Sequence, residues 1–166
     1  MRTHDLVETG DFFMAYPHGN IQQNMTDNQA VLNAVVANTE MGKNTMDQLI
    51  ELTQDRNLRA SFLNQQKEYR RLNQAAHTAI EACGGRSEGQ TPFARLTTKV
   101  GIWSQTIADK SNRNLADMVI QGATQGIMDC EKARKDYPGA SSGAKKLLDE
   151  LQQFEERTAQ DMRRFL

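Results

Sequence analysis

The fold class is decided by residues 54–85, QDRNLRASFLNQQKEYRRLNQAAHTAIEACGG. The main apolar side chains recur there at the spacing of one face of an α-helix: Leu58, Phe62, Tyr69, Leu72, Ala76 and Ile80. Asn57 is a candidate cap for the first turn of this helix. The pair Gly84–Gly85 predicts its end, because glycine readily adopts the left-handed conformation that terminates many helices.

The preceding segment predicts a helix that begins at Thr26. Residues 26–29, Thr-Asp-Asn-Gln, have the pattern of a capping box. Apolar or small residues then follow at helical spacing: Val31, Val35, Gly42, Met46 and Leu49. Because only residues 54–57 separate this helix from the next one, the two helices are expected to pack antiparallel.

Two more long helices are expected after a longer connection. Thr91–Pro92 predicts an extra helix within that connection, since proline is favoured in the first helical turn. Ser111 marks either a break or a bend before a helix that runs from about residue 112 to 136. Pro138 separates this helix from the last one, which starts at Ser141 or Ser142. The sequence therefore predicts an all-α fold, an antiparallel four-helix bundle formed by residues 26–166 as one domain.

Residues 1–25 differ from the rest of the chain. They hold Phe12, Phe13, Met14 and Tyr16 without a sustained period. We interpret this segment as an irregular N-terminal arm whose aromatic side chains need a surface to cover them. That surface is either the bundle of the same chain or a second subunit.

Three glycines lie near the middle of predicted helices, although each lowers helix stability by about 1 kcal/mol relative to alanine. They are Gly42, Gly122 and Gly126. One interpretation is close helix packing, or room for a bulky neighbour such as Tyr69 or Trp103. The other is a cavity for a small apolar ligand at mid-bundle.

This layout resembles the ferritin-like superfamily, and in particular uncharacterised bacterial ferritin-like proteins. The resemblance rests on two helical hairpins, a long link between them and the run ADMVIQGATQG at residues 116–126. It covers roughly residues 26–166. In the di-iron members of that superfamily, two helices each supply a glutamate and the other two a Glu-x-x-His motif.

The chain departs from that ligand pattern. Glu68 is followed three positions later by Arg71, and Glu155 by Thr158, where the motif requires histidine. His4 and His18 lie in the arm, and His77 is alone on its helix. We therefore expect no catalytic, cofactor or metal residues. The alternative is a non-standard ligand set of Glu40, Glu68 and Glu155, with Gln121 as a neutral ligand.

The composition narrows the possible partners. With a net charge of −1 the chain lacks the basic field that nucleic acid binding requires. It contains no apolar run long enough to span a membrane, and we expect no signal peptide. Cys83 and Cys130 form no Cys-x-x-Cys motif, so free thiols in a reducing cytoplasm are expected. Cys83 lies at a helix C-terminus, where the negative end of the helix dipole disfavours a reactive thiolate.

These observations favour a cytoplasmic, non-catalytic protein that acts by association with itself, as a homo-oligomer, or with a protein partner. No cofactor is expected. The alternative is a ferritin-like protein that handles metal or oxygen through the non-standard ligand set. A third hypothesis is the apolar ligand at the glycine-rich middle.

Overall fold

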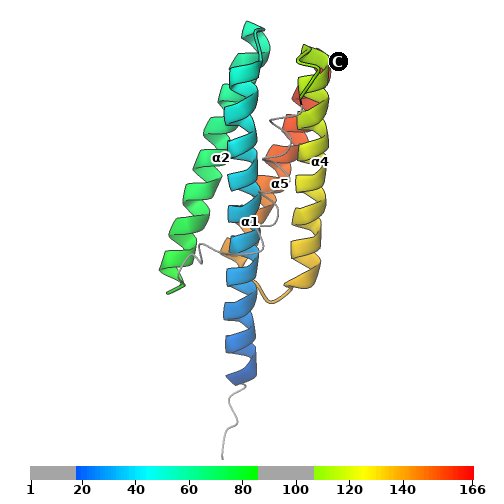
Figure 1. Ribbon diagram of the computed structural model, residues 1–166. Helices are drawn as coiled ribbons and strands as arrows, with labels where there is room; N and C mark the ends of the chain where they lie inside the picture. Colours follow the sequence, from blue (N-terminus) through cyan, green and yellow to red (C-terminus); the bar gives the residue numbers. More distant parts are fainter. Residues whose placement is uncertain (1–17, 86–106) are drawn as a thin grey trace, which may run out of the picture.

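Four helices lie side by side around a shared core (Figure 1). The computed structural model describes residues 18–85 and 107–166. The helices are α1 (His18–Leu52), α2 (Arg56–Ala82), α4 (Asn112–Asp136) and α5 (Ser142–Met162), followed by the 3₁₀ turn η1 (Arg163–Phe165). Within these ranges every regular element is helical, so the all-α prediction is confirmed there. The helix expected to begin at Thr91 lies outside the described residues, except for its last position, Ile107.

The core is formed by one apolar stripe from each helix. α1 packs against α2, α4 and α5. The fully buried side chains of the core include Leu32, Leu49, Phe62, Leu115 and Leu151. Each such side chain contributes about 1.5 to 3 kcal/mol when it leaves water. No helix in the described ranges is long and apolar enough to cross a membrane.

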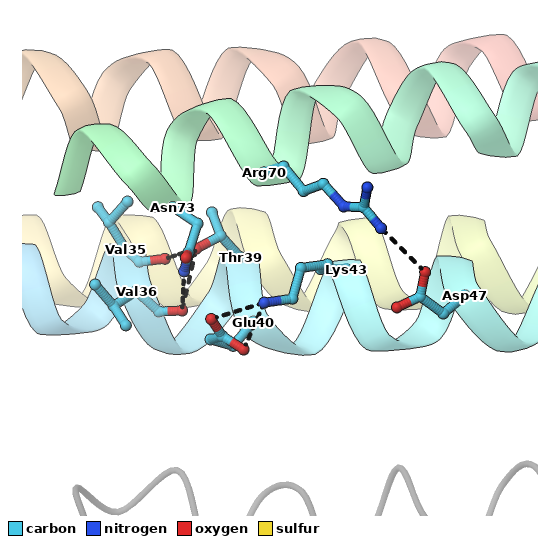
Figure 2. A network of polar contacts seen from close by, with 8 residues as sticks. All are labelled: Val35, Val36, Thr39, Glu40, Lys43, Asp47, Arg70 and Asn73. Carbon is cyan, nitrogen blue, oxygen red and sulfur yellow. Dashed lines mark hydrogen bonds and ion pairs between the residues drawn. The ribbon is translucent and has the colours of Figure 1, made fainter. Parts of the chain in front are cut away.

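Two polar contacts show how α1 and α2 are aligned with each other. Asn73 lies beside Thr39, whereas Arg70 forms an ion pair with Asp47 at 3.7 Å, so later positions on α1 meet earlier positions on α2 (Figure 2). The cap of α2 is Asp55 rather than the expected Asn57, and its carboxylate accepts a hydrogen bond from the Leu58 amide at 2.8 Å. At the other end of the helix, Gly84 has the predicted positive φ of 71°.

Serine caps begin both later helices. Ser111 is the N-cap of α4, and its hydroxyl accepts a hydrogen bond from the Asn114 amide at 3.3 Å. Residues 107–111 are not helical, so no helix continues through Ser111. Ser141 caps α5 in the same way. Arg134 near the end of α4 contacts Asp149 and Gln152 toward the middle of α5, so these two helices pair along their length.

The predicted start of α1 at Thr26 is wrong, because the helix begins at His18. The carboxylate of Asp27 does not cap α1. It accepts hydrogen bonds from the Gly139 amide and from Gln23, both at 2.8 Å, while Asn28 accepts one from the Ser141 amide. These side chains therefore hold the α4–α5 turn. Residues 18–25 are helical rather than irregular, and the rest of the predicted arm, residues 1–17, lies outside the described residues.

Loss of the Asp27 carboxylate is expected to lower the free energy of unfolding. Asp27 is 3% exposed, and Asp27→Ala removes the acceptor of the Gly139 amide. An unpaired buried donor costs about 1 to 3 kcal/mol. Asp117→Ala is the control, because Asp117 is exposed and accepts its hydrogen bond from Gln121 on its own helix. Urea denaturation of both variants measures the difference; equal losses would contradict the proposed role of Asp27.

Candidate functional site: a buried polar centre

A carboxyl group lies inside the core, where the other helices supply mainly apolar side chains. Glu155 on α5 is 2% exposed, and Tyr69 on α2 is 4% exposed. The Tyr69 hydroxyl lies 3.0 Å from both carboxyl oxygens of Glu155 and donates its hydrogen bond to them. Burial raises the pKa of Glu155 to about 8, and the Tyr69 hydrogen bond opposes this shift. Burial and the charge of Glu155 likewise raise the pKa of Tyr69 above its usual range.

The Tyr69 ring is held on two sides. The Phe154 ring meets it edge to face, with centroids 4.8 Å apart and an interplanar angle of 86°. On the opposite helix, a Cβ added to Gly42 would lie 2.3 Å from two ring carbons of Tyr69. The ring therefore rests on the bare backbone of α1. Gly42 leaves room for Tyr69, as the packing interpretation expected.

Gly126 on α4 likewise leaves room for two polar side chains. An added Cβ there would lie 2.8 Å from the Asn38 amide nitrogen and 3.0 Å from a carboxyl oxygen of Glu155. Asn38 is 7% exposed, and its amide nitrogen has no hydrogen-bond partner among the described residues. The space beside Gly42 and Gly126 is thus filled by protein side chains. An apolar ligand has no open position there.

Gly122 was expected to face inward and does not. It is exposed, and an added Cβ would meet no atom within 4 Å. Ala123, which is 2% exposed, faces the core instead. Gly122 therefore has no packing role in the described structure.

Cys130 lies one turn beyond Gly126 and is 2% exposed. Burial raises the pKa of its thiol to about 12, and the negative charge of Glu155 adds to the effect. A thiol of this kind stays protonated at neutral pH and is a poor nucleophile. Cys83 is exposed at the end of α2.

Buried polar side chains continue along one face of α2 at intervals of four residues: Ser61, Gln65, Tyr69 and Asn73. The Asn73 amide donates to the Thr39 hydroxyl at 2.9 Å, and this hydroxyl donates in turn to the Val35 carbonyl at 2.8 Å (Figure 2). Ser61 lies 2.7 Å from a guanidinium nitrogen of Arg164, which donates to it. Within residues 18–85 and 107–166, the Gln65 side-chain oxygen has no hydrogen-bond partner.

The non-standard ligand set does not converge. Glu40 accepts two hydrogen bonds from Lys43 at 2.9 Å (Figure 2), and Glu68 is bonded to Arg71 at 2.8 Å. Gln121 is exposed and donates to Asp117. Of the four residues Glu155 is the one inside the core, and the contacts of the described residues do not join the four in one coordination sphere.

Histidine adds nothing to this site. His77 is partly buried on α2, whereas His4 and the side chain of His18 lie outside the described structure. Residues 18–85 and 107–166 contain no group of three or more His, Cys, Asp or Glu side chains that could hold a metal ion.

Sequence reasoning missed the polar centre although a signal was present. The α5 core positions follow alternating steps of three and four residues: Leu148, Leu151, Glu155, Thr158 and Met162. Gln65 and Tyr69 continue the same pattern on α2, and Asn38 continues it on α1. Polar residues at core positions of this repeat predict a buried polar layer. The glycines at 42 and 126 then mark where bulky members of that layer cross to the facing helix.

Comparison with protein-family models, with curated proteins and with solved structures finds no significant match for this chain.

Proposed function

We propose that the protein is a non-catalytic, ferritin-like antiparallel four-helix bundle that acts by association with a second copy of itself or with a protein partner. Two sets of contacts support this arrangement of the helices. Thr39 and Asp47 on α1 meet Asn73 and Arg70 on α2 in reverse order. On the other pair, residue 134 of α4 contacts residues 149 and 152 of α5, and Gly126 lies beside Glu155.

The observation that carries the association is the length of α1. Asp27 and Asn28 hold the α4–α5 turn, and Gly85, beyond the end of α2, lies next to Gln29. α1 nevertheless continues to His18, past the ends of the other described helices (Figure 1).

The projecting end of α1, residues 18–25, has a sequence that supports a helix poorly. Gly19, Asn20 and Asn24 all have low helix propensity. Met25 is 53% exposed. A helical end of this composition gains stability mainly when it packs against another surface. In sequence it comes just after residues 12–16, whose aromatic side chains would also be stabilised by burial against another surface.

The candidate carboxylates are already paired with other side chains and the buried thiol is protonated, which supports a non-catalytic role. Glu40 and Glu68 each bind a cation on their own helix, Glu155 is bonded to Tyr69, and the Cys130 thiol is protonated. A metal- or oxygen-handling function would need ligands other than Glu40, Glu68 and Gln121. A cytoplasmic location belongs to the same proposal, and the two free thiols are consistent with it.

The test compares two exposed methionines by light scattering coupled to gel filtration. Met25 on the projecting end is 53% exposed, and Met128 on α4 is 57% exposed. We expect Met25→Asp to weaken self-association at least tenfold, because it places a charge in the contact, whereas Met128→Asp leaves the mass unchanged. Removal of residues 1–17 should act like Met25→Asp without lowering the helix content of α1.

Equal behaviour of the two methionine variants would contradict a contact at the projecting end. A wild-type protein that stays monomeric at high concentration would contradict self-association. Association with a different protein would then be the remaining form of the proposal, and Met25→Asp should abolish binding of that protein.

A further inference from the structure

The two helix pairs meet along a polar seam. In the described ranges, five hydrogen-bonded residue pairs link α1–α2 with α4–α5, their turn or η1: Asp27–Gly139, Asn28–Ser141, Ser61–Arg164, Tyr69–Glu155 and Arg71–Glu150. Asp27–Gly139 lies at the end of the helices, and the side chains of Arg71 and Glu150 are 52% and 38% exposed. Glu155 is the carboxyl of this seam that lies in the middle of the core.

The groups that face Glu155 offer little compensation for a negative charge. α1 presents the neutral Asn38, α2 the hydroxyl of Tyr69, and α4 the bare Gly126 and the protonated thiol of Cys130. The described structure gives Glu155 no ion pair with lysine, arginine or histidine. A buried carboxylate with one neutral donor is strongly disfavoured relative to the protonated acid.

We infer that Glu155 is a proton-controlled joint between the α1–α2 pair and the α4–α5 pair. The protonated carboxyl keeps the pairs closed, and its ionisation loosens the seam. This inference is independent of the proposed association, because it concerns contacts within one chain.

Buried polar atoms that lack hydrogen bonds along the seam can form them when the seam loosens. The Asn38 amide nitrogen is a free donor in the described structure. It and the Glu155 carboxyl both lie against the backbone of Gly126. The Gln65 oxygen and the Thr158 hydroxyl are also buried without partners. When the carboxyl ionises, the Asn38 donor and entering water can solvate it. In the closed state these groups lack hydrogen bonds, so opening also satisfies them.

The direction of the pH effect follows from the raised pKa. The pKa of Glu155 rises from 4.5 to about 8 in the folded protein, so between these values the folded state binds the additional proton. The stabilisation is fully present below pH 4.5 and is lost as the pH rises through about 8. Within this window the unfolding equilibrium constant should increase by up to roughly tenfold per pH unit.

The experiment measures chemical unfolding and amide hydrogen exchange of the full chain from pH 5.5 to 9. Glu155→Gln mimics the protonated carboxyl and should remove this pH dependence. Glu156→Gln makes the same carboxyl-to-amide change on the exposed face of the same helix and should keep the pH dependence. In the wild-type protein, amides of α5 and α2 around Glu155 and Tyr69 should lose protection at high pH before those of the α1–α2 turn.

A measurement on the wild-type chain guards against a variant that does not fold. Carbon NMR of the glutamate carboxyl groups should show one group that titrates near pH 8. The joint is excluded if every glutamate titrates below pH 6, if Glu155→Gln and Glu156→Gln have the same pH slope, or if protection falls uniformly along the chain.

Discussion

Gly42→Ala is expected to destabilise the protein by about 2 to 3 kcal/mol, although the same substitution in an open helical position is favourable. The new Cβ would lie 2.3 Å from the Tyr69 ring. The ring cannot move aside freely, because Phe154 lies against it and its hydroxyl is bonded to Glu155. Any shift that relieves the overlap therefore weakens the only hydrogen bond that the described structure gives the Glu155 carboxyl.

Gly122→Ala is the matched control and should stabilise the protein by about 1 kcal/mol, since the added methyl enters open space. Gly126→Ala should fall between the two, because the atoms it meets are the ends of the Asn38 and Glu155 side chains. Thermal and urea denaturation of the three variants give the order. A Gly42→Ala protein as stable as Gly122→Ala would show that the Tyr69 ring does not rest on α1.

Tyr69→Phe is expected to have a cost that grows with pH. Phenylalanine keeps the edge-to-face contact with Phe154 and removes only the donor to Glu155. A hydrogen bond between neutral groups contributes about 1 kcal/mol, and one to a charged group about 1.5 to 3 kcal/mol. The loss should therefore be near 1 kcal/mol at pH 6 and rise to about 2 kcal/mol at pH 9, because ionisation of Glu155 with a pKa of about 8 adds at most about 1.4 kcal/mol over that range.

A double-mutant cycle with Glu155→Gln isolates this interaction. In the Glu155→Gln background, the cost of Tyr69→Phe should be small and independent of pH. A pH-independent cost in both backgrounds would mean that the Tyr69 hydroxyl does not respond to the charge of Glu155.

Local sequence signals predicted most of the described fold. The period of Leu58, Phe62 and Leu72 located α2, and the helix stop at Gly84 and the start at Ser111 follow from local backbone chemistry. The start of α1 could not be found in this way. A side chain such as Asp27 accepts hydrogen bonds equally well from its own helix or from a distant turn, and only the packed structure decides between them.

The candidate site was predictable only in part. Glu155 was among the proposed ligands, and Tyr69 was considered as the reason for a mid-helix glycine. Their contact joins positions 86 residues apart, and no local pattern encodes that pairing. The proposed partners Glu40 and Glu68 stay outside the core, with side chains 27% and 32% exposed, because each lies off the three-and-four repeat that defines the core face of its helix.

The polar layer also affects which alignments of the helices are possible. Leucine packs acceptably against leucine after a slide of one helical turn, about 5.4 Å, so an entirely apolar core tolerates slipped arrangements. A slide of α5 along α2 would separate the Glu155 carboxyl from the Tyr69 hydroxyl, and a slide of α1 would bring the Met46 or Asn38 side chain against the ring that now crosses Gly42. The residues that weaken the core thus select one register, much as a single buried asparagine does in coiled coils.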